Sequence, residues 1–190
     1  MTRGPYIPEK LDNPATGDSA TIERSALFGE PDTSIVFTLP AQAIGAPPHH
    51  HGSYCETFSV IAGALEVRRG PKLEPVTLTP GAQITIGCGE IHAFRNASDH
   101  AAVVFRVSVA EGAGFEQFVR AWYGLGRSGL FAGDRPRNPL HLALALDAGD
   151  INLAGVPVGL QKLVRRSLIG LAKLTGVDSV VTKHWRGTHV

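Results

Sequence analysis

The stretch that decides the fold is residues 47–67, PPHHHGSYCETFSVIAGALEV, in which three consecutive histidines precede an apolar run. If residues 49–51 are extended, successive side chains point to opposite faces, so His49 and His51 share one face and His50 takes the other. Two imidazoles on one face can bind the same metal ion. Glu56 follows a short glycine-containing turn and opens the next strand, where its carboxylate can supply a third ligand.

Short apolar runs, separated by proline and glycine, flank this stretch up to about residue 110. They are SIVFTL (34–39), ETFSVI (56–61), ALEVRR (64–69), PVTLT (75–79), AQITI (82–86), HAFRN (92–96) and AAVVFRVSV (101–109). Several alternate apolar with polar residues, as strands with one buried face do. Many short strands without a long helix between them predict an all-β sandwich or small barrel.

The spacing of apolar residues becomes helical after Glu111. The segment GFEQFVRAWYGLG (114–126) predicts a helix that stops at Gly124 or Gly126. A second helix is predicted with Asn138 as N-cap, Pro139 as its first residue and Gly149 as C-cap.

A third predicted helix, from about Pro157 to Gly176, has a leucine-rich face. Its apolar stripe consists of Leu160, Leu163, Val164, Leu168, Leu171 and Leu174, and Lys162, Arg165, Arg166 and Lys173 lie off that stripe. We expect the stripe to pack on the barrel or on a partner subunit. The alternative is a basic amphipathic helix that lies on a membrane surface.

Composition limits the class of protein. The 190 residues carry a formal net charge of +1, which argues against a chain-wide nucleic-acid surface. The N-terminal residues have no apolar region typical of a secretory signal, and no apolar run reaches the ~18–20 residues that span a bilayer. Cys55 and Cys88 are the only cysteines, so no disulfide framework is expected and a reducing cytoplasm is the predicted location. We expect both thiols to be inert, with a redox pair as the alternative.

Two motifs carry a family resemblance. Residues 49–63 read H-x-H-x4-E-x6-G, and residues 81–96 read G-x5-G-x-G-x2-H-x3-N. These stretches resemble the two motifs of the cupin superfamily, in particular single-domain bacterial cupins. The family's first motif supplies two histidines and a glutamate, matched by His49, His51 and Glu56, and its second supplies a histidine, matched by His92. The resemblance implies a double-stranded β-helix (jelly-roll) barrel with these ligands turned inward around one divalent metal.

The resemblance covers about residues 34–109 and departs from the family pattern twice. Pro47 and Pro48 occupy the interval in which the family usually has a longer gap after a glycine, here Gly45. The second motif usually has a proline where Gly87 stands, which predicts a looser turn. We expect an N-terminal arm with a possible edge strand (1–33), a cupin β-barrel (34–112) and a helical C-terminal extension (113–190).

Three imidazoles and a carboxylate suit Fe, Mn, Ni, Cu or Zn, without choosing among them. An open coordination position can polarise a substrate, lower the pKa of water or bind O2. The first hypothesis is a quercetinase-like dioxygenase for a small enolisable or phenolic compound, with Glu56 as both ligand and catalytic base. An apolar wall is expected from Val60, Ile84, Ile86, Phe94 and Phe105. The alternatives are a non-catalytic small-molecule sensor and a metal-dependent isomerase or lyase.

The remaining expectations concern partners. A homodimer is the expected assembly, because closed two-fold dimers are the commonest oligomers. We expect a small-molecule substrate or ligand and no nucleic acid.

Overall fold

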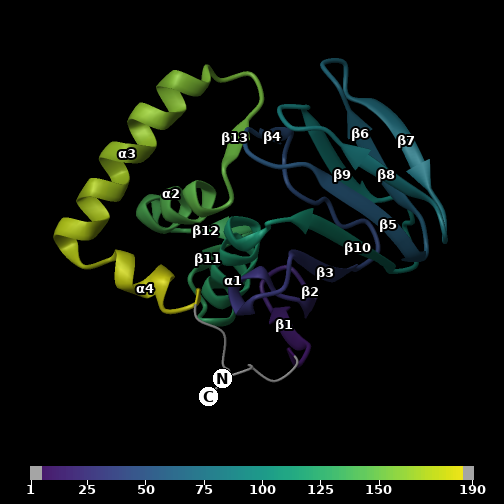
Figure 1. Ribbon diagram of the computed structural model, residues 1–190, viewed down its shortest axis with the longest axis horizontal. Helices are drawn as coiled ribbons and strands as arrows, with labels where there is room; N and C mark the ends of the chain where they lie inside the picture. The colour runs from purple at the N-terminus through teal and green to yellow at the C-terminus, as the bar shows by residue number, and fades with distance from the viewer. Residues whose placement is uncertain (1–5, 186–190) are drawn as a thin grey trace.

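Two β-sheets face each other and the helices gather at one side of them (Figure 1). The structure is a computed structural model and describes residues 6–185. In order across the sheet, the first sheet contains β1 (Glu9–Asn13), β2 (Asp18–Arg24), β3 (Asp32–Leu39), β10 (Val103–Ala110), β5 (Glu56–Ala62) and β8 (Gln83–Ile86). The second contains β13 (Ile151–Leu153), β4 (His49–His51), β9 (His92–Asn96), β6 (Leu65–Arg69) and β7 (Glu74–Leu78).

All seven apolar runs predicted as strands lie in these sheets. β10 shows the reason, because its buried side chains alternate with half-buried ones along the strand. It pairs antiparallel with β3 on one side and with β5 on the other, which places its buried face at the centre of the first sheet. The predicted all-β jelly-roll barrel with a C-terminal helical part is confirmed.

The barrel interior is filled by aromatic and branched side chains. The rings of Phe58, Phe94 and Phe105 contact one another at centroid distances of 5.5–6.1 Å. Val60 and Ile86 are buried in the same core, and Ile84 and Phe94 pack against it half-buried. The residues predicted to form an apolar wall therefore belong to the packed core of the barrel.

The N-terminal segment, expected as an arm with a possible edge strand, contributes two strands. β1 and β2 pair antiparallel, and β2 pairs with β3, so the segment extends the first sheet by a hairpin. The sequence prediction underestimated the strand content of this segment because proline, glycine and aspartate are frequent in it. Leu11, Ala20 and Ile22 nevertheless supply a buried face. The first five residues of the predicted arm and the last five of the predicted extension lie outside the described residues.

Helix α1 (Ala113–Arg127) packs against β1 and β3. It also contacts a short 3-10 turn, η1 (Ala26–Phe28). The prediction that it stops at Gly124 or Gly126 is wrong, because both glycines lie inside the helix. They allow close packing instead. A Cβ at Gly124 would lie 2.4 Å from the His184 ring, and one at Gly126 would lie 2.2 Å from Asn13 Oδ1.

Helix α2 (Pro139–Ala148) begins and ends as predicted. The Asn138 side chain accepts a hydrogen bond from the Leu140 N–H, and Gly149 is the C-cap. A short ribbon of β11 (Phe131–Ala132) and β12 (Arg135–Pro136) connects α1 to α2. Strand β13 follows α2 and pairs antiparallel with β4, so the C-terminal extension adds a strand beside the three histidines.

Helix α3 (Val158–Thr175) has the predicted ends but the opposite orientation. It runs along the outer edge of the molecule, away from β6 and β7 (Figure 1), and packs on α2 and on α4 (Asp178–Thr182). Leu160, Leu163, Val164, Leu171 and Leu174 are exposed, so the expected packing of this stripe on the barrel is wrong. The buried residues of α3 are Arg165 and Ala172. Arg165 donates to two backbone carbonyls on this inner side of the helix.

Candidate metal centre

The three histidines of β4 divide as strand geometry requires. His49 and His51 are 3% and 4% exposed and point into the barrel, whereas His50, between them, is half-buried on the other face. His49 lies directly opposite His92 in the pairing of β4 with β9. The pairing of these two short strands thus brings the first and second motifs together.

Glu56 completes a buried group with these three histidines. One ligand atom of each of His49, His51, Glu56 and His92 lies within 4.8 Å of the others. Glu56 Oε2 is 2.8 Å from His92 Nε2 and 3.4 Å from His51 Nε2. The carboxylate is 5% exposed and His92 is fully buried. Strand β5 holds Glu56 in place through its pairing with Ile86 of β8.

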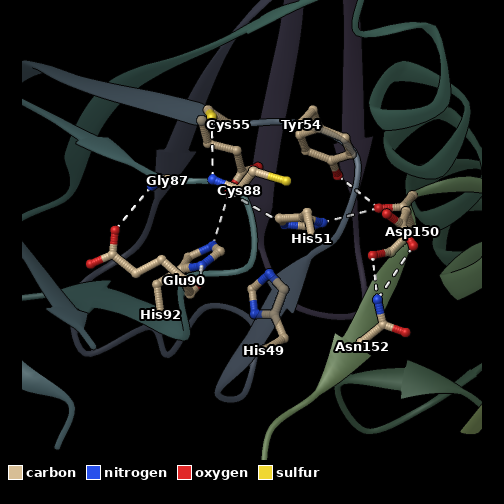
Figure 2. Close-up of polar contacts among 12 residues, drawn as sticks. His49, His51, Tyr54, Cys55, Gly87, Cys88, Glu90, His92, Asp150 and Asn152 are labelled. Carbon is tan, nitrogen blue, oxygen red and sulfur yellow. Dashed lines mark hydrogen bonds and ion pairs between the residues drawn. The ribbon is translucent and has the colours of Figure 1, made fainter. Parts of the chain in front are cut away.

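The rings of His49, His51 and His92 lie together (Figure 2), and a backbone carbonyl orients each of them. The Nδ1 atoms of His49, His51 and His92 lie 2.8, 3.0 and 3.2 Å from the carbonyl oxygens of Pro47, Gly149 and Glu90. A carbonyl only accepts, so each Nδ1 carries the proton and each Nε2 presents a lone pair to the centre. The Nε2 atoms of His51 and His92 are buried without a hydrogen bond of normal geometry. Outward Nδ1–H groups and orphaned inward Nε2 atoms fit a bound cation.

The electrostatics of the group favour the ligand forms of its members. Burial, together with the neighbouring His92 and His51, lowers the pKa of His49 to about 3, so its imidazole is neutral at pH 7. Burial raises the pKa of Glu56, but the adjacent His51 and His92 imidazoles outweigh it when charged and hold the pKa below its usual range. The ionised Glu56 carboxylate therefore faces the Nε2 atoms of His51 and His92, with the neutral His49 ring beside them. That arrangement is stabilised by a cation.

Residues 35–109 match the family model described as Cupin domain. The chain contains a cupin domain. This confirms the superfamily inferred from the two motifs, and the buried His and Glu group can hold a metal ion, as the resemblance implied. No curated protein matches the chain.

Solved structures similar to this chain include several cupins. KdgF from Halomonas sp. shares 19% identity over 50% of this chain and 81% of its own, with a TM-score of 0.43. A cupin-superfamily sugar phosphate isomerase from Silicibacter pomeroyi shares 22% identity over 54% and 71%, with a TM-score of 0.46. The polyketide cyclase RemF from Streptomyces resistomycificus shares 17% identity over 58% and 80%, with a TM-score of 0.47. Likeness at this level says nothing about substrate or reaction.

The C-terminal extension reaches the candidate metal centre of the cupin domain, which the sequence did not reveal. The Gly149 carbonyl accepts from His51 Nδ1 and from the Tyr54 hydroxyl, the latter at 2.7 Å. The Tyr54 ring also stacks on His51, with centroids 4.4 Å apart. Asp150 accepts from the Gly52 N–H and the Ser53 hydroxyl, both at 2.8 Å. Gly149 was predicted only as a helix cap, and nothing in its local pattern indicates a contact 98 residues away.

The turn before His92 is held despite the missing proline. The Gly87 N–H donates to Glu90 Oε2 at 3.0 Å, a bond that a proline could not make. Arg69 binds both oxygens of Glu90, at 2.6 and 2.8 Å, and lowers the pKa of that carboxyl. Side-chain contacts therefore restrain this turn, in which glycine stands where proline was expected.

Cys55 and Cys88 lie side by side next to this centre. Both are free and exposed. The Cys88 N–H donates to Cys55 Sγ at 3.2 Å, and the Cys88 thiol donates to the Gly52 carbonyl at 2.6 Å. Neither sulfur belongs to the group of potential metal ligands found among residues 6–185.

A cavity of about 250 Å³ borders the cupin domain where the helices meet it. Tyr54, Phe115, Glu111 and Asp150 are among its lining residues. Because Tyr54 lines this cavity and also stacks on His51, its ring lies between the cavity and the metal centre.

Proposed function

We propose that the chain is a metal-dependent cupin enzyme that binds one divalent transition metal through His49, His51, Glu56 and His92. The observation that carries the proposal is the arrangement of the imidazoles. Three Nδ1 atoms face backbone carbonyls, and the Nε2 atoms converge on one carboxylate in a buried space. Imidazole and carboxylate donors suit Fe, Mn, Ni, Cu or Zn.

We further propose a dioxygenase of the quercetinase type, with a small enolisable or phenolic substrate. The metal, when bound, supplies Lewis acidity and a position for O2. The chain's own contribution is positioning and proton transfer. Carbonyls fix the three imidazoles, and Glu56 Oε2, which lies beside His51 and His92, is the acceptor of the hydroxyl proton of the substrate. Tyr54 controls the approach from the neighbouring cavity, since its ring covers His51 on that side.

The test has two steps. Elemental analysis of gently purified protein should find about one transition metal per chain, and the metal-loaded protein should consume O2 with a member of a panel of flavonols and β-diketones. His51→Ala should abolish both signals, and His50→Ala is the matched control that keeps them. Metal without O2 uptake would favour a Lewis-acid isomerase or lyase, or a sensor. Protein without metal would contradict the proposal altogether.

A cytoplasmic location and a homodimeric assembly are also part of the proposal. Two free cysteines suit a reducing compartment. Two-fold dimers are the commonest closed assemblies, and light scattering of the full chain tests this expectation directly.

A further inference from the structure

Helix α3 presents an apolar face that the rest of the chain leaves exposed. Leu163 is 63% exposed and Leu174 is 87% exposed. The full set, here called the leucine stripe, is Leu160, Leu163, Val164, Leu171 and Leu174. At 100° per residue these side chains span an arc of about 100° on one side of the helix, with Ser167 as the polar residue inside it, its hydroxyl donating to the Leu163 carbonyl. They account for five of the ten large hydrophobic residues that are exposed in residues 6–185.

Polar side chains on the inner face fix this orientation. Arg165 Nη1 donates to the carbonyls of Leu146 and Ile151 at 3.2 and 2.9 Å, and its Nη2 donates to Asn152 Oδ1 at 3.2 Å. Gln161 binds both the N–H and the carbonyl of Leu153, at 2.9 and 3.0 Å. Turning the helix to bury the leucine stripe would break all of these bonds and expose a paired arginine. The stripe is therefore held outward by the fold.

The charge of α3 has a single sign. The helix contains no aspartate or glutamate, and Lys162, Arg166 and Lys173 are all exposed. Their spacing of four and seven residues places them in one row between the leucine stripe and the buried side of the helix, where Lys162 and Arg166 also border a hollow lined by Asp147 and Asp150. An apolar stripe next to a cationic row is complementary to an anionic, apolar surface. It is less suited to a second copy of the same helix, because pairing would bring two cationic helices together.

We propose that α3 docks on the surface of a bilayer that contains anionic lipids. The leucine stripe enters the boundary between headgroups and acyl chains, and Lys162, Arg166 and Lys173 lie at the level of the lipid phosphates. The helix lies on the membrane and does not cross it: among residues 6–185, no helix is long and apolar enough to span a bilayer. This inference is independent of the metal-dependent activity proposed above.

Flotation of the full chain with vesicles tests the inference. The wild-type protein should float with phosphatidylglycerol vesicles at low salt and stay unbound with pure phosphatidylcholine vesicles, and added NaCl should release it. The double variant Leu163→Ser/Leu171→Ser should bind at least ~10-fold more weakly, because two apolar anchors are lost. Arg166→Gln/Lys173→Gln should also bind roughly 10-fold more weakly, because two contacts with anionic lipid are removed.

Matched controls separate docking from general surface effects. Ile44→Ser removes an exposed apolar side chain (81%) from the barrel, and Lys10→Gln/Lys72→Gln removes two positive charges far from α3. Both should bind like wild type, and circular dichroism should show that all variants stay folded. The inference is overturned if wild-type protein ignores phosphatidylglycerol vesicles, or if the leucine variant binds as well as Ile44→Ser. It is also overturned if the leucine variant changes the oligomeric state in lipid-free solution, since the occupant is then a second copy.

Discussion

The barrel interior buries polar side chains, whereas helix α3 exposes apolar ones. In the barrel, His49, His51, Glu56 and His92 are polar and buried. On α3, the leucine stripe is apolar and exposed. Folded proteins ordinarily bury apolar groups and solvate ionisable ones, so each departure has a cost in free energy that the fold itself must offset. The two departures differ in what offsets them and in what they indicate.

In the barrel, the backbone holds the polar side chains in their buried positions. Carbonyls of Pro47, Gly149 and Glu90 orient the imidazoles, and strand parity decides which histidines point inward. On α3, side chains hold the leucine stripe outward, chiefly Arg165 and Gln161. Both proposals rest on these restraints: a cation in the barrel would balance the buried polar group, and an anionic apolar surface would cover the leucine stripe.

The two regions are also connected. Arg165 of α3 binds the carbonyl of Ile151 and the side chain of Asn152 in β13, and β13 pairs with β4 along all three histidines. The extension that exposes the leucine stripe thus also supports the strand that carries His49 and His51.

The largest expected effect follows removal of the extension after Gly112, the proposed domain boundary. The truncation deletes α1, whose Phe115, Val119 and Tyr123 belong to the barrel core, and it deletes β13, which pairs with β4. We expect an aggregating protein, because an apolar face and a strand edge are uncovered together. A truncated chain that is soluble and as stable as the full one, by light scattering and thermal unfolding, would show that the barrel folds on its own.

Single substitutions at the metal centre should give the next largest effect. His49→Ala, His51→Ala and His92→Ala should lose most of the metal and all metal-dependent activity, because each removes an oriented donor. Glu56→Ala should resemble them, with weak metal binding retained through three imidazoles. Loss of the metal also removes its stabilisation of the folded state, so thermal stability should fall.

His50→Ala is the internal control for this series, because its side chain lies on the opposite face of β4. Metal stoichiometry of the five variants, purified side by side, is the measurement. If His50→Ala loses the metal and His49→Ala keeps it, the strand register is shifted by one residue and the proposed ligands are wrong.

The sequence predicts the barrel region well because its information is local. Strand alternation and side-chain parity depend on neighbouring residues, so the runs from 34 to 109 and the division of the three histidines could be read directly. The Gly149 carbonyl could not, because its contact with His51 joins segments 98 residues apart. The orientation of α3 failed for a related reason: a periodic stripe shows that a helix has two faces, but Arg165 and its distant carbonyls decide which one is buried.

Arg165 allows this point to be tested with an adjacent control. Arg165→Met should destabilise the protein by about 2–3 kcal/mol, because it removes the guanidinium donor from the carbonyls of Leu146 and Ile151 and from Asn152 Oδ1. For a chain of this length, that corresponds to a fall in the midpoint of thermal unfolding of roughly 5–10 °C. Arg166→Met, one residue away and exposed, should change stability by less than ~0.5 kcal/mol. Equal effects of the two substitutions would mean that Arg165 does not hold α3 in place.

The cysteines should give the smallest effect, although both are near proposed metal ligands in sequence. Cys55 directly precedes Glu56, and Cys88 lies in the turn that leads to His92. Their thiols nevertheless lie outside the group of potential ligands: Cys88 donates to the Gly52 carbonyl, and Cys55 accepts from the Cys88 N–H. A serine hydroxyl can make both contacts, so Cys55→Ser and Cys88→Ser should keep the metal content of wild type and change stability by less than ~0.5 kcal/mol. Thiol titration should find both cysteines reduced in freshly purified protein. Loss of metal in either variant would show that three imidazoles and one carboxylate are not the complete donor set, because a thiolate would then be required.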